Sequence, residues 1–298
     1  MKDYLVRGTI SNRPIRVMAC VTTHLVEEAR VAHDLWPTSS AALGRMMSAT
    51  LMMGSMLKNE EKLTVTINGG GPIGTMLCVT NGDGKIKGFV GNSQCMYTNN
   101  HTGKLAVSAA VGNQGYLQVI RDMRLKEPFF SKIPLQTGEI GDDFTAYFAY
   151  SEQTPSAVSL GVLVGEQNEI LASGGFIIQL LPDATEEDIT YVESSLKDFP
   201  PVSQLIHEGL TPEAILKKLF DDVHILETQD LMFECNCSKA SFENSLMTLG
   251  KAELLDMIEE DHGCEVTCQF CNKKYHFSED DLKALINTMD EQYANKPH

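Results

Sequence analysis

The sequence has no long apolar run, and it has few cysteines over most of its length. None of its apolar stretches approaches the roughly 20 residues that a membrane-spanning helix needs. The opening stretch MKDYLVRGTISNRPIRVMAC mixes charges into its apolar runs and so lacks the apolar centre of a secretory signal peptide. We therefore expect a cytoplasmic protein with no membrane partner.

An excess of basic charge is also missing. The 298 residues carry a net charge of −16, and the excess acid lies in the last part of the chain. Residues 1–178 hold 15 acidic and 15 basic residues, residues 179–231 hold 12 acidic residues and 3 lysines, and residues 232–298 hold 13 acidic residues and 6 lysines. Nucleic-acid binding needs a basic surface to neutralise phosphates, so we expect no nucleic-acid partner. The change in charge near residue 178 also marks a boundary in the chain.

The cysteines gather near the C-terminus, where five of the eight fall within 37 positions. Four of them form a C-x-C pair, Cys235 and Cys237, and a C-x-x-C pair, Cys268 and Cys271, with 30 residues between the pairs. In a reducing cytosol such pairs are more often metal ligands or redox switches than structural disulfides. Structural zinc takes four ligands in a tetrahedron, often four thiolates. The pattern therefore predicts one Zn²⁺ per chain, held by these four cysteines.

Other nearby groups leave the ligand set open to alternatives. His262 and His276 could each replace a cysteine, and Cys264 is a fifth thiol without a place in a tetrahedron. The segment 232–298 has only 67 residues and hence little core of its own. Structural zinc contributes about 10–16 kcal/mol to the folding of such modules, whereas the total stability of a domain is about 5–15 kcal/mol. Loss of zinc should therefore unfold this segment.

The apolar patterns predict an α+β core over residues 1–178. Two strands open the chain, and helical patterns cover 24–35 and 39–58, the second capped by Ser39 or Ser40 and buried in the core. A glycine-rich meander follows, with a hairpin signal at NGDG. The strand pattern then continues over FTAYFAYSEQTPSAVSLGVLVG and ends with ASGGFIIQLLPD.

The acidic composition and the apolar spacing of residues 179–231 predict a linker of three amphipathic helices. Thr185 caps the first helix, Gly209 ends the second, and Thr211 caps the third. We expect the apolar faces of these helices to dock on the core. Those faces carry Ile189, Val192, Leu196, Phe199, Leu205, Ile206, Ile215, Leu219 and Phe220.

Residues 232–298 predict a small domain with a strand-like start. Helical patterns cover 242–249 and 251–260, and the stretch CEVTCQFCNKKYHF predicts a hairpin whose turn lies at CQFC. Ser278, with Asp281 three positions later, marks the start of a final helix.

These motifs closely resemble those of the redox-regulated 33-kDa chaperonin family, which are bacterial heat-shock holdases. The resemblance rests on the C-x-C and C-x-x-C order with its flanking residues and on INGGGPIGTMLCV, KGFVGN and DDFTAYFAYSEQTPS, and it covers nearly the whole chain. It implies a core domain at 1–178, a regulatory helical linker at 179–231 and a zinc-binding redox-switch domain at 232–298. It also implies ATP-independent binding of unfolding client proteins after oxidation, zinc release and homodimer formation, with later hand-over to an ATP-dependent chaperone.

By position, the four paired cysteines take the zinc-ligand and redox-switch roles of that family. We expect disulfides Cys235–Cys237 and Cys268–Cys271 after oxidation, since loops that are short along the chain have the lower entropic cost of closure. Cys264 lies outside the family pattern and could compete for Cys268 or Cys271.

The resemblance implies a chaperone of the stress response and not an enzyme, with no catalytic residue. One alternative is a thiol oxidoreductase, in which C-x-x-C usually opens a helix of a thioredoxin-like fold; here strand residues flank the motif. Another is a zinc-ribbon nucleic-acid binder, which the negative charge of the segment disfavours.

Overall fold

The computed structural model describes residues 2–58, 60–99 and 102–294. These residues form two compact units, 1–234 and 235–298, and each is described by itself. Helices and strands occur in both units, so the predicted α+β class is confirmed. Among the described residues, none of the helices combines the length and the apolar character that crossing a bilayer requires.

The first unit contains a five-stranded antiparallel sheet, called sheet A below. In spatial order its strands are β10 (Val223–Asp230), β1 (Tyr4–Ile10), β2 (Ile15–Val21), β9 (Ile170–Leu180) and β8 (Ser156–Val164). Strands β1 and β2 are the two strands that the opening sequence predicts, with Leu5 paired to Cys20. Strand β9 is buried on both faces along most of its length, because helices cover each side of the sheet.

The second sheet of this unit, sheet B, has six strands. In spatial order they are β11 (Met232–Phe233), β5 (Lys85–Val90), β4 (Met76–Asn81), β3 (Lys62–Asn68), β6 (Tyr116–Asp122) and β7 (Phe129–Pro134). The predicted turn at NGDG joins β4 to β5, and Gly84 takes a φ of 80° there, a value that suits glycine. Neighbouring strands are antiparallel except β11, which runs parallel to β5.

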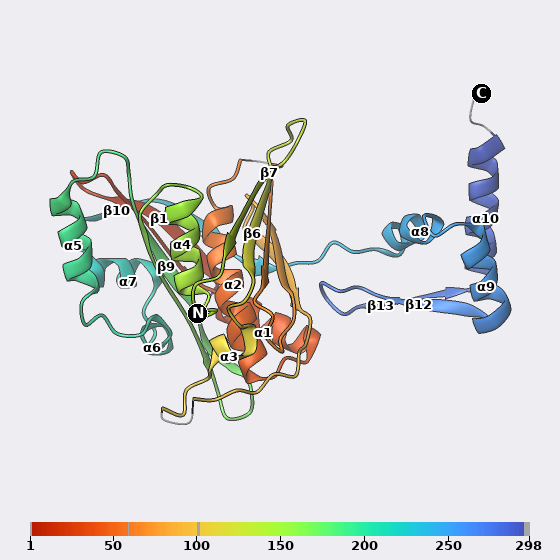
Figure 1. The fold of residues 1–298 in the computed structure, drawn as a ribbon, viewed down its shortest axis with the longest axis horizontal. Helices are drawn as coiled ribbons and strands as arrows, with labels where there is room; N and C mark the ends of the chain where they lie inside the picture. The colour runs from red at the N-terminus through yellow and green to blue at the C-terminus, as the bar shows by residue number, and fades with distance from the viewer. Residues whose placement is uncertain (1, 59, 100–101, 295–298) are drawn as a thin grey trace. The chain divides into compact units, whose positions relative to one another are not determined.

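Helix α2 (Pro37–Gly54) lies between the two sheets and forms the centre of the core (Figure 1). It contacts strands of both sheets and is buried on nearly all sides, as expected for a core helix. Two of its buried hydroxyls donate to the helix backbone, Ser48 Oγ to the Gly44 carbonyl at 2.8 Å and Thr50 Oγ1 to the Met46 carbonyl at 2.7 Å. The buried methionines of this helix are Met46, Met47, Met52 and Met53.

The predicted cap of α2 at Ser39 or Ser40 is wrong. The helix begins at Pro37, whose missing N–H and fixed φ suit the first helical position. Ser39 and Ser40 therefore lie inside the helix and are buried. Helices α1 (Thr23–His33) and α3 (Val107–Val111) both contact α2.

The strand predicted over FTAYFAY is also wrong, because these residues belong to helix α4 (Gly141–Tyr150). The carboxylate of Asp143 accepts hydrogen bonds from the backbone N–H groups of Gln136 and Ile140 at 2.7 and 3.0 Å, which fixes the first turn. Aromatic residues favour strands in general, but here their spacing is helical. The side chains that this spacing buries are Phe144, Tyr147 and Phe148.

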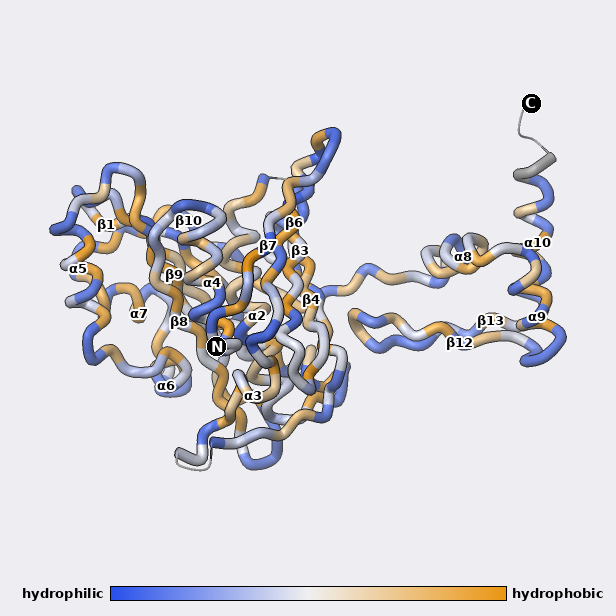
Figure 2. The backbone as a smooth tube through the Cα atoms, in the orientation of Figure 1, coloured by the Kyte–Doolittle hydropathy of each residue, from blue (hydrophilic) through white to orange (hydrophobic). Residues whose placement is uncertain are grey.

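Helices α5 (Glu186–Leu196), α6 (Val202–His207) and α7 (Pro212–Leu219) pack on the face of sheet A that points away from α2 (Figure 1). The predicted caps Thr185 and Thr211 are confirmed, and Thr211 Oγ1 accepts from the Ala214 N–H at 3.2 Å. Figure 2 shows the hydrophobic stretches along the strands of this unit and hydrophilic residues at the loop tips. The helix residues buried against sheet A are Val192, Val202, Leu205, Ile206, Ile215, Leu216 and Leu219, with Phe220 after α7.

After α7 the chain returns to both sheets, a feature that the sequence patterns did not indicate for residues 223–230. Strand β10 pairs with β1 at the edge of sheet A, and β11 follows directly at the edge of sheet B. Most of β10 is exposed or half-buried, so it lacks the clear apolar alternation of an inner strand.

The second unit holds helices α8 (Lys239–Met247), α9 (Lys251–Asp261) and α10 (Glu279–Ala294) and the hairpin of β12 (Gly263–Thr267) and β13 (Lys274–Ser278). The predicted hairpin and the start of the last helix are confirmed: Asp281 N donates to Ser278 Oγ at 3.2 Å. The second unit has a small hydrophobic core, called the C-terminal core below. It contains Leu246, Leu254, Ile258, Phe277, Leu282, Leu285, Ile286 and Met289.

Candidate metal centre

The two cysteine pairs lie in different kinds of backbone. Cys235 and Cys237 belong to the segment 234–238, which forms neither helix nor strand and connects β11 to α8. Cys268 and Cys271 lie in the turn between β12 and β13. Two backbone hydrogen bonds close that turn, from Cys268 N to the Lys273 carbonyl at 2.9 Å and from Asn272 N to the Cys268 carbonyl at 2.8 Å.

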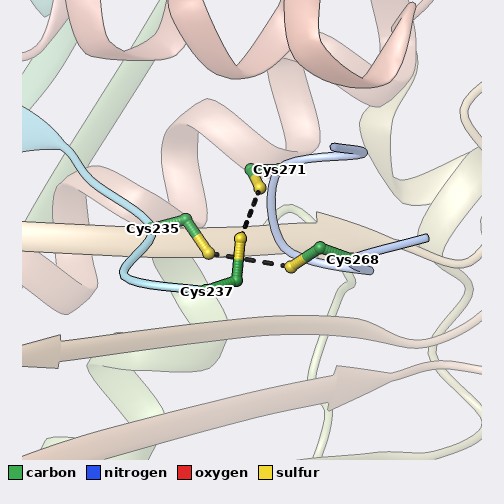
Figure 3. Close-up of side chains that lie close together, drawn as sticks. All are labelled: Cys235, Cys237, Cys268 and Cys271. Atoms are coloured by element: carbon green, nitrogen blue, oxygen red, sulfur yellow. Dashed lines mark hydrogen bonds between the residues drawn. The ribbon is translucent and has the colours of Figure 1, made fainter. Parts of the chain in front are cut away.

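The four sulfur atoms converge on one point (Figure 3). Cys235 Sγ lies 3.7 Å from Cys268 Sγ, and Cys237 Sγ lies 3.4 Å from Cys271 Sγ. All four atoms lie within 4.8 Å of one another. Four sulfurs placed tetrahedrally at about 2.3 Å from a zinc ion would be about 3.8 Å apart. The cluster thus has the size and the donor set of a four-thiolate metal site.

A tyrosine from the hairpin completes the surroundings of Cys237. Tyr275 Oη lies 3.2 Å from Cys237 Sγ and donates to the Cys237 carbonyl oxygen at 3.0 Å. Sequence reasoning missed this residue. Its signal is an aromatic residue with a polar tip four positions after Cys271, on the strand that leaves the turn.

The surroundings shift the pKa values of Cys235 and Cys237 in opposite directions. Burial raises the pKa of Cys235 to about 12. Burial also acts on Cys237, but hydrogen bonds with Tyr275 and with the other thiols outweigh it and lower the pKa of Cys237 to about 7. Cys237 is therefore the sulfur of this pair that becomes a thiolate more readily near neutral pH, and the thiolate is the form that binds metals and reacts with oxidants.

The remaining cysteines lie outside this cluster. Cys264, on β12, packs against the C-terminal core, and burial raises its pKa. Cys20, Cys78 and Cys95 are buried in the first unit, and burial raises the pKa of Cys20 to about 12 and that of Cys78 further still. Buried thiols of this kind are poor nucleophiles.

The two histidines considered as replacement ligands have other partners. His262 Nδ1 lies 2.9 Å from Glu279 Oε1, and His276 Nε2 lies 3.3 Å from Glu265 Oε2. Neither belongs to the group of four clustered ligand atoms.

The C-x-x-C pair does not open a helix. Because β12 precedes the pair and β13 follows it, Cys268 does not lie at a helix N-terminus, which is the position of the reactive thiol in thioredoxin-like proteins. The geometry favours joint ligation of a metal over thioredoxin-like thiol exchange.

Comparison with known proteins gives one consistent result. The family model "Hsp33 protein" matches residues 3–278. The 33 kDa chaperonin of Staphylococcus haemolyticus is 49% identical over 290 residues, covering 97% of this chain and 99% of that protein. The 33 kDa chaperonin of Bacillus cytotoxicus is 47% identical over 291 residues, covering 97% and 100%. The crystal structure of the 33 kDa chaperonin, a heat shock protein 33 homologue, from Thermotoga maritima is similar with a TM-score of 0.91 and 33% identity, covering 98% of this chain and 100% of that one.

Proposed function

The chain belongs to the Hsp33 family, and from that membership we propose that it is a redox-regulated, ATP-independent holdase. The similar proteins are named chaperonins, so the chain is a chaperone. The observation that carries the redox part of the proposal is the convergence of four thiols from two chain segments within 4.8 Å of one another.

In the reduced state, Cys235, Cys237, Cys268 and Cys271 would hold one Zn²⁺. Four sulfur donors in a near-tetrahedral arrangement suit this ion. Bound zinc would keep the sulfurs as thiolates and link the segment after β11 to the β12–β13 turn. The C-terminal core is small, so this link supplies much of the stability of the second unit.

Oxidation would join the sulfurs in pairs and free the metal. For each pair, two thiolates, two protons from solvent and one hydrogen peroxide molecule would give one disulfide and two water molecules, so the sulfurs are oxidised and the peroxide is reduced. We propose the bonds Cys235–Cys237 and Cys268–Cys271. A C-x-C disulfide closes a small, strained ring, and strained disulfides are readily reduced again, which suits a reversible switch.

We divide the chain into a core at 1–178, a linker at 179–231 and a switch domain at 232–298. Oxidation of the switch domain would release the linker from the core. Helices α5–α7 cover one face of sheet A through apolar contacts. The polypeptide then passes through β10 and β11 to Cys235, directly into the segment that oxidation would unfold. Undocking of the linker would expose its own apolar residues and those of sheet A to unfolding client proteins.

The remaining properties follow from the same proposal. The protein would act in the cytoplasm, bind unfolding clients, form a homodimer when oxidised and pass its clients to an ATP-dependent chaperone. It would catalyse no reaction and bind neither nucleic acid nor membranes. The high negative charge of residues 179–298 would keep the exposed state soluble.

The test is to measure zinc content, free thiols and suppression of client aggregation on the full-length protein before and after hydrogen peroxide. We expect about one zinc per chain and no suppression in the reduced protein, then loss of four thiols, loss of zinc and gain of suppression. Full suppression by the reduced, zinc-loaded protein would refute the redox switch, and an unchanged thiol count in an activated protein would refute the cysteine chemistry.

A further inference from the structure

Tyr275 is fixed in place by the C-terminal core. It lies on β13 opposite Val266, on the same face of the hairpin as Phe277 two residues later, and it packs against that core. Its ring lies 5.1 Å from the ring of Phe242 on α8, at an interplanar angle of 45°. These contacts set the position of the phenol hydroxyl.

That hydroxyl meets Cys237 twice, at the sulfur and at the backbone carbonyl. Because Tyr275 Oη contacts both the sulfur and the carbonyl oxygen of Cys237, it restricts the side-chain orientation of Cys237. The residues are 38 positions apart, so the contact joins the first cysteine pair to the strand that follows the second pair.

The backbone fixes the side-chain directions of Cys235 and Cys237 less than those of Cys268 and Cys271, so the first pair depends more on side-chain contacts. Cys268 and Cys271 lie in a turn that two backbone hydrogen bonds close. Cys237 lies in the segment 234–238, where neither a helix nor a strand fixes the side-chain direction.

We propose that Tyr275 is a positioning residue for the metal site, which holds Cys237 in the orientation that ligation requires. The inference rests on the four-thiolate zinc site proposed above. A protonated Cys237 can donate to Tyr275 Oη, whereas a metal-ligating thiolate has no proton and can only accept from it. The phenol has one proton, which it donates to the Cys237 carbonyl while the thiol is protonated. On ligation that proton would turn from the carbonyl to the thiolate sulfur, a charge-assisted bond that stabilises the ligating form.

The test compares full-length, reduced wild type with Tyr275→Phe, which keeps the ring and removes the hydroxyl. Each protein is loaded with Zn²⁺, and a chromophoric chelator competes for the metal. Removal of a group that hydrogen-bonds to a metal ligand weakens metal affinity about 10- to 100-fold. We expect a loss of that size in Tyr275→Phe, with one zinc still bound at saturation. The matched control is Tyr150→Phe, since Tyr150 is 68% exposed and lies in the other unit; its zinc affinity should stay within twofold of wild type.

Two further measurements separate positioning from a purely structural role. The circular dichroism of zinc-saturated Tyr275→Phe should match wild type, and in the Co²⁺-substituted protein the sulfur-to-cobalt absorption should shift without losing the intensity of four thiolates. Unchanged zinc affinity in Tyr275→Phe, or loss of helical signal at saturating zinc, overturns the inference. If the wild type itself binds no zinc, the proposed function fails instead, and the wild-type arm shows that outcome directly.

Discussion

Arg13 and Asp188 form an ion pair across the boundary between the core and the acidic helices, with Arg13 Nη1 2.6 Å from Asp188 Oδ1. Arg13 precedes β2, and Asp188 lies in the first turn of α5. The guanidinium also lies 4.4 Å from the ring centroid of Tyr191 on the same helix. Arg13 Nη2 also lies 3.4 Å from Glu187 Oε1, so one arginine side chain contacts three residues of α5. It connects the strands of sheet A to a helix that the proposed mechanism requires to move.

This ion pair predicts a pH dependence of α5 docking. Hydrogen bonds from the Thr185 backbone and from Arg13 hold the pKa of Asp188 below its usual value. A carboxyl whose pKa is lower in the folded state stabilises that state above its unfolded pKa of about 3.9, and this contribution is lost as the pH falls through the folded value. Asp188→Asn should therefore unfold at lower urea concentration than wild type at pH 7, and the difference should shrink below pH 4. A difference that is constant from pH 7 to pH 3 would show that the charge of Asp188 does not hold the helix.

A second prediction concerns the apolar face of the linker. Leu219 is 6% exposed against sheet A, and the Phe199 ring meets the Phe176 ring at 5.7 Å. Burial of a large apolar side chain stabilises a fold by about 1.5–3 kcal/mol, so Phe199→Asp or Leu219→Asp should undock the linker. We expect partial suppression of client aggregation without oxidant and with zinc still bound, measured by light scattering beside zinc content. Lys217→Asp, on the exposed face of α7, is the control and should stay inactive. If both core-facing variants gain activity only together with zinc loss, linker undocking is not the gate.

A third prediction concerns the metal ligands. Cys268 is 4% exposed and lies at the start of the turn that also carries Cys271. Cys268→Ser should reduce zinc from about one equivalent to nearly none under chelator competition, because structural sites need all four ligands. Cys264→Ser should retain about one equivalent, since its thiol packs against the C-terminal core. Full zinc affinity in Cys268→Ser would mean that His276 or Cys264 takes its place.

The pairing of the disulfides gives a fourth prediction. Peptide mapping of the oxidised protein should find Cys235–Cys237 and Cys268–Cys271, the pairs with the shortest loops. The folded cluster offers another outcome, because Cys235 Sγ lies 3.7 Å from Cys268 Sγ and Cys237 Sγ lies 3.4 Å from Cys271 Sγ. Dominant crosswise bonds would show that oxidation precedes unfolding. A dominant bond from Cys264 to Cys268 or Cys271 would contradict the proposed pairing altogether.

Much of the fold could be predicted from local patterns. The opening strands, the helix caps at Thr185 and Thr211, and the hairpin around CQFC depend on residues close together in sequence, so local chemistry indicates them. Local patterns do not identify helix α4, because its aromatic residues favour strands, whereas the Asp143 carboxylate and the helical spacing decide the outcome. They do not identify strand β10 either, because an exposed edge strand lacks an apolar alternation, and its pairing with β1 defines it.

The candidate metal site, like the fold, could be predicted only in part from local patterns. The C-x-C and C-x-x-C spacing predicts that Cys235, Cys237, Cys268 and Cys271 form one site, since paired cysteines in such a chain are typical of metal ligands or redox switches. It left Cys264 and two histidines as possible substitutes, because spacing along the chain does not say which way a side chain points. The folded structure shows that Cys264 packs against the C-terminal core, that His262 and His276 pair with glutamates, and that Tyr275 contacts Cys237. These relationships join residues that are brought together by the packing of a hairpin and three helices, and packing depends on the whole unit at once, not on any local stretch.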